Sequence, residues 1–358
     1  MNSYDAWFAS LLGSAYTSKV GSDHNWERQE EYLRCCDESL KDLELVKLAD
    51  RPAASAPPVV SVIHNESARL QSFLVHYRKI GVQHFMVIDH RSTDSSSDFL
   101  SKQSDVSLYR TEASYESSVG GQMWVTGLAR RCALGEWVLH VDADELLVYD
   151  GMEQHGLGDL VRLLEKRGET RLYAPMIDMY PKGPITQARN NGRPTLLEAA
   201  PYFDPMETLE GINYQRVPST GRAALMNLSR ARRFGSPLAR DGRPVKHLMD
   251  KFPLSLWHSG TAYCSVHQPY PFRENPGHAM GALLHFKFSG DFVAYNKSVA
   301  RMGEAWCGAI ENAWYVDQIE RGHAVSFYHS GSKRYVSPRT LIDENFIEPI
   351  DWSVLSEA

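Results

Sequence analysis

The sequence lacks the features that mark a membrane-spanning, a disulfide-stabilised or a nucleic-acid-binding protein. Its 358 residues contain no run of about 18 apolar residues, and its start lacks a basic segment followed by an apolar one. The five cysteines show no C-x-x-C spacing, which argues against zinc and redox motifs and for a reducing compartment. The net charge of -6 gives no general attraction to a polyanion. We therefore expect a cytoplasmic protein with no transmembrane segment and no nucleic-acid partner.

One stretch is locally basic, RARRFGSPLARDGRPVKH at residues 230 to 247. A solvated loop is the simpler interpretation of this stretch. The alternative is contact with phosphates or anionic lipid headgroups, which would allow peripheral membrane contact at the inner face of the membrane.

Internal repeats and low-complexity segments are also absent, and the clearest boundary is the Pro/Ala/Ser linker RPAASAPP. Residues 1–57 are predicted to be a helical N-terminal appendage and linker, with the helix in residues 26–48. Residues 58–327 are predicted to form one α/β domain, and residues 328–358 a C-terminal tail.

Apolar strands alternate with amphipathic helices from Val59 onward. Strands are predicted at residues 59–63, 84–89, 106–109, 136–142 and 171–177, and helices at residues 68–80, 121–134 and 157–166, with a further helix capped by Thr93 or Asp94. This alternation implies right-handed βαβ units and a mostly parallel, Rossmann-like sheet flanked by helices. Ligands bind beyond the carboxyl ends of the strands in such a sheet.

Polar residues follow three of these strands. They are His64, Asn65 and Glu66 after the first, Asp89, His90 and Arg91 after the second, and Asp142, Asp144 and Glu145 after the fourth. Carboxylates that share a site repel each other unless a cation lies between them, and Mn²⁺ or Mg²⁺ suits oxygen ligands while leaving positions open for phosphate. The alternative is that the two aspartates cap a turn and the glutamate is solvated.

Three segments resemble, in order, the nucleotide-binding segments of family 2-type glycosyltransferases of the GT-A fold. They are VVSVIHNES, HFMVIDHRSTDSS and GEWVLHVDADELLVYDG, and the third carries the D-x-D motif. The resemblance covers residues 59–150 and extends more faintly to about residue 300 through YAPMIDMYPKG and LLHFKFS. It implies a metal-dependent, hexosyltransferase-like enzyme that moves a sugar, with inversion, from a nucleotide-sugar to a glycan or glycolipid acceptor, as in polysaccharide biosynthesis. A UDP-sugar is the first donor to expect.

The resemblance also implies roles for single residues. The first segment, residues 64–66, would border the nucleotide base and ribose, and Asp89 would hydrogen-bond the base. Arg91 stands where the family has Asn or Gly, and it would bind a phosphate or simply lie on the surface. Asp142 would contact the ribose or the metal-bound diphosphate and counts among the metal ligands, while Asp144 would ligate the metal directly.

A metal held by one or two carboxylates needs a further ligand, and in many enzymes of this fold a late histidine supplies it. His258, His267 and His285 are the candidates, although a histidine among apolar neighbours is more often a core residue. His285 is preferred because it matches the family's late segment. Lys287, two residues further on, would face the same side of a strand and neutralise the diphosphate.

The catalytic base that an inverting transfer requires has no clear counterpart. Asp178, at the end of the strand after the acids, is the preferred candidate, and a turn residue is the alternative interpretation of it. Glu207 and Glu210 come second, and Glu145 is expected to orient the metal loop. A sugar-nucleotide nucleotidyltransferase stays open, though the segment VIHNESARL lacks the glycines of its phosphate loop. A non-catalytic module that binds a glycan or a partner stays open as well.

Overall fold

A computed structural model describes most of the chain. The described residues are 26–50, 56–185, 195–209, 214–216, 223–225, 228–235, 249–263, 267, 269–271, 280–288, 292–303, 306–321 and 325–356. Glu210 and most of the basic stretch at 230–247 lie outside them.

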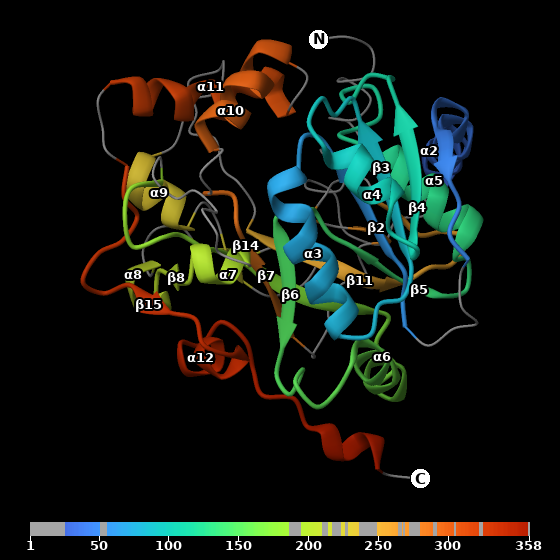
Figure 1. Cartoon of the computed structure of the whole chain (residues 1–358). Coiled ribbons are helices and arrows are strands. Elements are labelled where there is room, and N and C mark those ends of the chain that lie inside the picture. The colour runs from blue at the N-terminus through green and yellow to red at the C-terminus, as the bar shows by residue number, and fades with distance from the viewer. Residues whose placement is uncertain are drawn as a thin grey trace.

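A nine-stranded sheet forms the centre of the molecule, in the order β1-β4-β3-β2-β5-β11-β7-β14-β6 (Figure 1). Its strands are β1 (Glu44–Lys47), β2 (Val59–Ile63), β3 (Phe85–His90), β4 (Val106–Thr111), β5 (Trp137–His140), β6 (Glu145–Tyr149), β7 (Arg171–Asp178), β11 (Asp250–Leu256) and β14 (Gly281–His285). β1, β11 and β6 are antiparallel to their neighbours, and the other six run in one direction. The predicted mostly parallel α/β sheet is confirmed.

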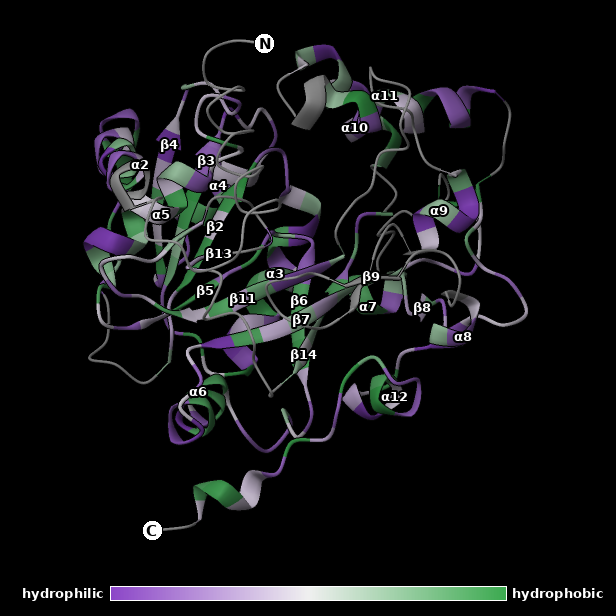
Figure 2. Ribbon diagram, turned by 180° about the vertical axis from the view of Figure 1, so that it is seen from behind, coloured by the Kyte–Doolittle hydropathy of each residue, from purple (hydrophilic) through white to green (hydrophobic). Residues whose placement is uncertain are grey.

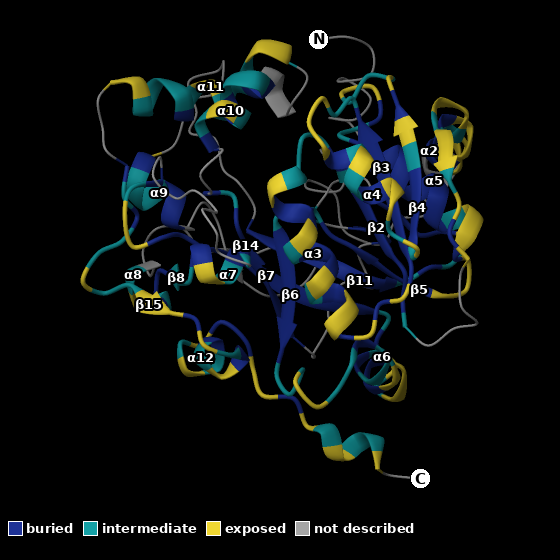
Figure 3. Cartoon of the chain, in the orientation of Figure 1, coloured by how far each residue is buried: buried dark blue, intermediate teal, exposed yellow. Residues whose placement is uncertain are grey.

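Alternating residues of the central strands pack against helices on opposite faces. Val59 and Ile63 of β2 share a core with α3 (Ser67–Lys79), whereas Val60 between them packs with α5 (Gln122–Cys132). The strands are therefore buried on both faces, while the outer faces of the helices are exposed (Figure 3). Figure 2 shows the same division as apolar strands inside more polar helices.

Smaller elements surround this core. The remaining helices are α2 (Trp26–Ser39), α4 (Ser96–Ser101), α6 (Leu157–Lys166), α7 (Leu196–Ala199), α8 (Met206–Leu209), α9 (Leu228–Phe234), α10 (Phe292–Met302), α11 (Trp306–Glu320) and α12 (Pro338–Asp343), with 3-10 turns η2 (Leu40–Asp42) and η5 (Trp352–Leu355). The short strands are β8 (Tyr202–Phe203), β9 (Tyr214–Arg216), β10 (Ala223–Leu225), β12 (Ala262–Tyr263), β13 (Pro269–Tyr270) and β15 (Lys333–Arg334). No helix among the described residues is long and apolar enough to cross a bilayer.

The N-terminal segment differs from its prediction. The expected helix over residues 26–48 is correct only to Ser39, because the chain then forms β1 and pairs with the outer edge of β4. Edge pairing overrides helix propensity here, since it satisfies the backbone groups of both strands. α2 also packs against α5. The domain boundary near residue 57 remains a prediction, although the sheet itself begins before it.

Candidate metal and nucleotide site

The acids after β5 lie in a tight turn that the side chain of Glu145 closes. The Glu145 amide donates to the Asp142 carbonyl over 3.0 Å, and the Asp142 amide donates to Glu145 Oε2 over 3.1 Å. The Asp142 and Asp144 side chains are 40% and 20% exposed, whereas that of Glu145 is 0% exposed. Glu145 is thus a buried cap rather than a solvated residue, and it begins β6, a strand that the sequence pattern did not predict.

Lys251 of β11 supplies a cation that sequence reasoning missed. Its Nζ lies 2.9 Å from Asp142 Oδ2 and 2.5 Å from Glu145 Oε1, and its side chain is 2% exposed. The contact with Oε1 is an ion pair that lacks hydrogen-bond alignment, so Oε1 accepts no hydrogen bond within the described residues. Asp142, predicted as a metal ligand, is therefore already paired with a side chain of the protein.

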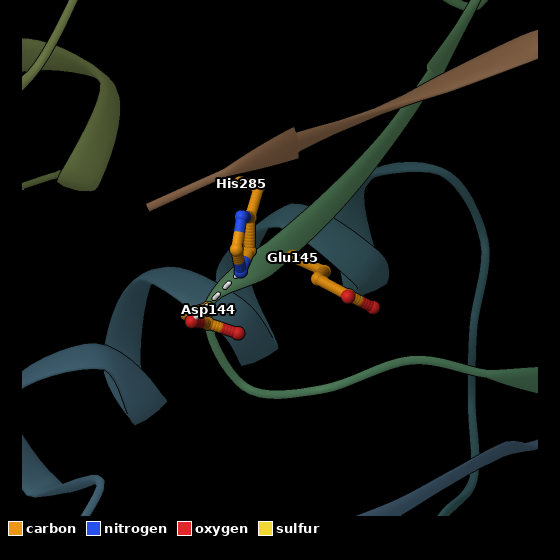
Figure 4. A group of neighbouring side chains, drawn as sticks. All are labelled: Asp144, Glu145 and His285. Carbon is orange, nitrogen blue, oxygen red and sulfur yellow. Dashed lines mark ion pairs between the residues drawn. The ribbon is translucent and has the colours of Figure 1, made fainter. Parts of the chain in front are cut away.

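Asp144 faces His285 across the sheet edge. His285 ends β14, and its Nε2 lies 3.3 Å from Asp144 Oδ2. Figure 4 shows these two side chains pointing toward each other while the Glu145 carboxylate turns away. Of the candidate histidines, His285 pairs with Asp144. His267 instead lies with its Nδ1 2.9 Å from the carbonyl oxygen of Asp250.

Asp178 and Arg230 lie behind His285. Asp178 Oδ1 lies 2.8 Å from His285 Nδ1, and Arg230 of α9 donates to both Asp178 oxygens over 3.0 and 3.1 Å. Arg230 Nη2 is also 2.9 Å from Nδ1, but a guanidinium only donates, so the hydrogen bond of Nδ1 goes to Asp178. A carboxylate behind a histidine in this way fixes the tautomer whose Nε2 faces a metal.

Asp178, the predicted catalytic base, is buried and fully hydrogen-bonded. The Asp178 side chain is 0% exposed and both of its oxygens accept hydrogen bonds. Burial opposes its ionisation, but Arg230 and His285 outweigh burial and keep the pKa of Asp178 below its usual value. A buried, saturated carboxylate with a lowered pKa is poorly suited to take a proton from an acceptor. The surroundings of Asp178 instead favour a positioning role.

The charges at the centre of the site are strongly coupled. Burial disfavours the charged form of His285, but Asp144 and Asp178 more than compensate and raise its pKa to about 9. Burial likewise opposes ionisation of Asp144, yet His285, Arg69 and Lys251 lower its pKa. Asp144 and His285 are thus a charged pair that a divalent ion would split by displacing the Nε2 proton.

Burial raises the pKa of Glu145 to about 7, even though Lys251 acts in the opposite direction. Lys251 itself keeps its charge, because the two carboxylates outweigh burial and raise its pKa. The charged ammonium of Lys251, 2.5 Å from Glu145 Oε1, favours the ionised form of Glu145.

Lys287, predicted to meet the diphosphate, is held by α11. Its Nζ lies 3.2 Å from Glu311 Oε1 and 5.2 Å from the centre of the Tyr315 ring. Arg230 Nη1 approaches the same Glu311 oxygen to 3.6 Å. Lys287 therefore lies on the same side as Arg230, with a carboxylate between the two cations.

The first predicted segment borders the site through its backbone turn. Asn65 has a positive φ of 56°, and its Oδ1 accepts the amides of Thr93 and Asp94 over 2.7 and 3.2 Å. His64 Nδ1 donates to the His90 carbonyl at 2.7 Å. These bonds join the loops after β2 and β3 into one rigid wall.

Glu66 and Arg69 connect the first segment with Asp144. Arg69 Nη1 pairs with Glu66 Oε2 at 2.7 Å, and the charge of Arg69 contributes to lowering the pKa of Asp144. Burial, Glu66 and Asp144 in turn raise the pKa of Tyr295 on α10 well above its usual value. The charges of Glu66 and Asp144 therefore both act on Tyr295 of α10.

Asp89 and Arg91 lie further along the second loop. Asp89 is buried and its Oδ1 accepts the Ser92 amide over 3.0 Å. The Arg91 guanidinium donates to the Glu112 carbonyl at 2.6 Å, beside the end of β4. Glu207, a second candidate base, lies on α8.

The donor set fits a divalent ion. Asp144, Glu145 and His285 each offer a ligand atom, and these atoms lie within 4.8 Å of one another. Two ligands that an ion holds at right angles at about 2.1 Å lie about 3.0 Å apart, and the observed separation of Asp144 Oδ2 and His285 Nε2 is 3.3 Å. The third oxygen, Glu145 Oε1, lies 2.5 Å from Lys251 Nζ, so Asp144 and His285 are the two ligands that the protein leaves to an ion. A carboxylate with an imidazole suits Mn²⁺ and leaves coordination positions for phosphate oxygens.

Sequence reasoning missed Lys251 and Arg230. Lys251 is a single charged residue in the apolar segment KFPLSLW, and that isolation was the available signal. Arg230 belongs to the stretch interpreted as a solvated loop, but it lies in α9 and is only 8% exposed. The solvated-loop interpretation is wrong for this residue, because Asp178 requires a buried counter-charge.

The fold and the site define a mixed α/β protein with a candidate divalent-metal centre at the carboxyl edge of its sheet. No protein-family model matches the chain, and no curated protein matches it. Solved structures similar to it include the 1–349 fragment of TarS from S. aureus, with 19% identity over 40% of this chain and 48% of that one and a TM-score of 0.28. A longer TarS structure gives 18% identity over 35% and 22%, with a TM-score of 0.26.

A further similar structure is the mannosyltransferase PcManGT from Pyrobaculum calidifontis in complex with GDP-Man and Mn²⁺. It shows 14% identity over 52% of each chain and a TM-score of 0.24. The chain thus spans less than two thirds of each of these proteins. At this level of similarity, the function must be argued from the site itself.

Proposed function

We propose that the protein is a metal-dependent glycosyltransferase that uses a nucleotide-sugar donor. The observation that carries the proposal is the Asp144–His285 pair, with Asp178 behind it, at the edge where the loops after β2, β3 and β5 meet. This edge is where ligands bind in sheets of this kind. A bound Mn²⁺ or Mg²⁺ would act as a Lewis acid for the leaving diphosphate.

The side chains of the protein supply the rest of the proposed site. Asp144 and His285 would hold the ion, and Asp178 and Arg230 would hold His285 in the ligating tautomer. Lys287 would release Glu311 and approach the diphosphate, so that the charge developing on the leaving group meets a cation. The wall formed by His64, Asn65 and Glu66, with Asp89, would border the nucleoside.

The finer assignments rest on the family resemblance. They are a UDP-sugar as the first donor to test, a glycan or glycolipid acceptor, transfer with inversion, and a cytoplasmic setting with peripheral membrane contact. The hydrogen bonds that Arg230 donates to both Asp178 oxygens favour a positioning role for Asp178 over that of the catalytic base.

A thermal-shift titration with UDP, GDP, CMP and ADP, each with and without Mn²⁺, tests the proposal. A ligand at 100 times its dissociation constant adds about 2.7 kcal/mol to the free energy of unfolding. We expect a shift for one nucleotide that requires Mn²⁺ and is lost in Asp144→Ala. No shift with any nucleotide, or a shift that Asp144→Ala retains in full, would contradict the proposal.

A further inference from the structure

The amino end of β11 places Lys251 beside Asp142, although the two residues are 109 positions apart in the sequence. β11 is antiparallel to both β5 and β7, so its first residues lie at the edge where those two strands end. Lys251 is in register with Ala174 of β7, and the pairing shifts between Lys251 and Leu254. A charged residue at this position of a buried strand has to find its partners in the turn after β5.

Lys251 meets two of the three acids. Its ammonium lies between Asp142 Oδ2 and Glu145 Oε1, at 2.9 and 2.5 Å. Glu145 in turn accepts the Asp142 amide through its other oxygen. The three residues therefore form a closed ring in which the position of each charge depends on the other two.

We propose that Lys251 is a positioning residue that divides the acids between two cations. Resting on the proposed function, this inference assigns Asp142 and Glu145 to the ammonium and leaves Asp144, with His285, to the divalent ion. Lys251 fixes one oxygen of Asp142, and the 40% exposed Asp142 side chain keeps a fixed orientation toward the donor. Lys251 also limits the negative charge that an incoming diphosphate meets.

The decisive variant is Lys251→Met, which removes the charge and keeps a similar side-chain length. At a pH at which Glu145 is ionised, the site then carries one more uncompensated negative charge, so the affinity for Mn²⁺ alone rises, by about tenfold for one charge a few ångström from the ion. The affinity for UDP at saturating Mn²⁺ falls by about tenfold, because Asp142 loses its orientation and the diphosphate meets more negative charge. A residue that only supports the fold would weaken both.

Two further variants keep the inference testable if Lys251→Met does not fold. Lys251→Arg retains the charge, and we expect Mn²⁺ affinity within about twofold of the parent because the local charge is unchanged. Lys251→Met with Glu145→Gln removes an ion pair as a unit, which a fold tolerates better than the loss of one partner. This double variant keeps the net charge, so Mn²⁺ affinity stays near that of the parent while UDP affinity remains low.

Mn²⁺ affinity is measured from the electron paramagnetic resonance signal of free Mn²⁺, and UDP affinity by calorimetry on the full chain. A higher Mn²⁺ affinity with a lower UDP affinity in Lys251→Met would support the positioning role. So would an unchanged Mn²⁺ affinity with a lower UDP affinity in the double variant. Parallel losses, or an unchanged UDP affinity in the double variant, would overturn it while the proposed function stands. If the parent protein binds neither Mn²⁺ nor any nucleotide, both the positioning role of Lys251 and the proposed function are contradicted.

Discussion

Asp178→Asn isolates the contribution of the carboxylate behind His285. Arg230 only donates hydrogen bonds, so the new amide oxygen turns toward Arg230 and the amide NH₂ toward His285 Nδ1. Nδ1 must then accept, which moves the imidazole proton to Nε2 and blocks the lone pair that faces Asp144. Removing such a partner from a metal-ligating histidine typically costs 10–100-fold in metal affinity, and we expect about that loss for Mn²⁺.

The chain offers a matched control in Asp204→Asn. Asp204 is also 0% exposed, accepts two hydrogen bonds from Arg232 at 2.8 and 2.9 Å, and lies 3.0 Å from His329 Nε2. Each variant removes the carboxylate that accepts two hydrogen bonds from an arginine, a loss of about 3–5 kcal/mol of stability for a fully buried pair, and Arg230 keeps Glu311 at 3.6 Å. The 22% exposure of Arg232 makes the loss in Asp204→Asn the smaller one.

Urea unfolding gives the stability of each variant, and calorimetry gives the affinity for Mn²⁺. We expect both variants to lose stability and only Asp178→Asn to lose affinity for Mn²⁺. Equal Mn²⁺ affinities in the parent and Asp178→Asn would refute the argument. So would an equal loss in Asp204→Asn, because the effect would then follow from stability alone.

Three further predictions address other parts of the account. The pKa of His285 is raised to about 9, so a proton on His285 competes with the metal below that pH. Mn²⁺ affinity, measured by calorimetry, should therefore rise about tenfold per pH unit from pH 6 to 8. An affinity that does not change with pH would exclude His285 as a ligand. Gly127→Ala should cost about 1–3 kcal/mol in urea unfolding, since its Cβ would lie 2.5 Å from the Cys36 carbonyl, whereas Gly183→Ala has open space and should cost little. Asp89→Asn should weaken nucleotide binding in thermal-shift titrations and leave Mn²⁺ affinity unchanged; a loss of Mn²⁺ affinity would move Asp89 from the nucleoside to the metal.

Stability should also follow the raised pKa of His285 when no metal is bound. The folded pKa of about 9 exceeds the ordinary value of 6.5, so this group contributes stability that is fully present below pH 6.5. That contribution is lost as pH rises through 9. Unfolding midpoints in metal-free buffer should therefore fall between pH 7 and 9 in the parent, and they should fall less in His285→Ala.

The first half of the sheet could be predicted because its signals are local. β2, α3 and β3 follow one another with clear apolar periodicity, and the loops after them belong to the same segments. The pairing of Asp144 with His285 came from the family resemblance, and the structure places the two residues 3.3 Å apart. Their roles as ligands remain predictions.

The rest depends on contacts between residues far apart in the chain. Lys251 is 109 residues from Asp142, and nothing in the pattern of β11 shows that it enters the sheet between β5 and β7. Arg230 is hidden within a basic stretch whose charge suggests solvent, although its partner Asp178 lies 52 residues earlier. Such long-range pairs have no periodic signature, so only the fold identifies them.

The position of the bound ion is the most direct test of the central claim. Crystals grown with Mn²⁺ and UDP, measured with X-rays at the manganese absorption edge, would locate the ion from its anomalous signal. We expect one peak within ligand distance of Asp144 Oδ2 and His285 Nε2, with Lys251 still beside Asp142. A peak held by Asp142 and Glu145 in place of Lys251, or no peak at this edge of the sheet, would contradict it.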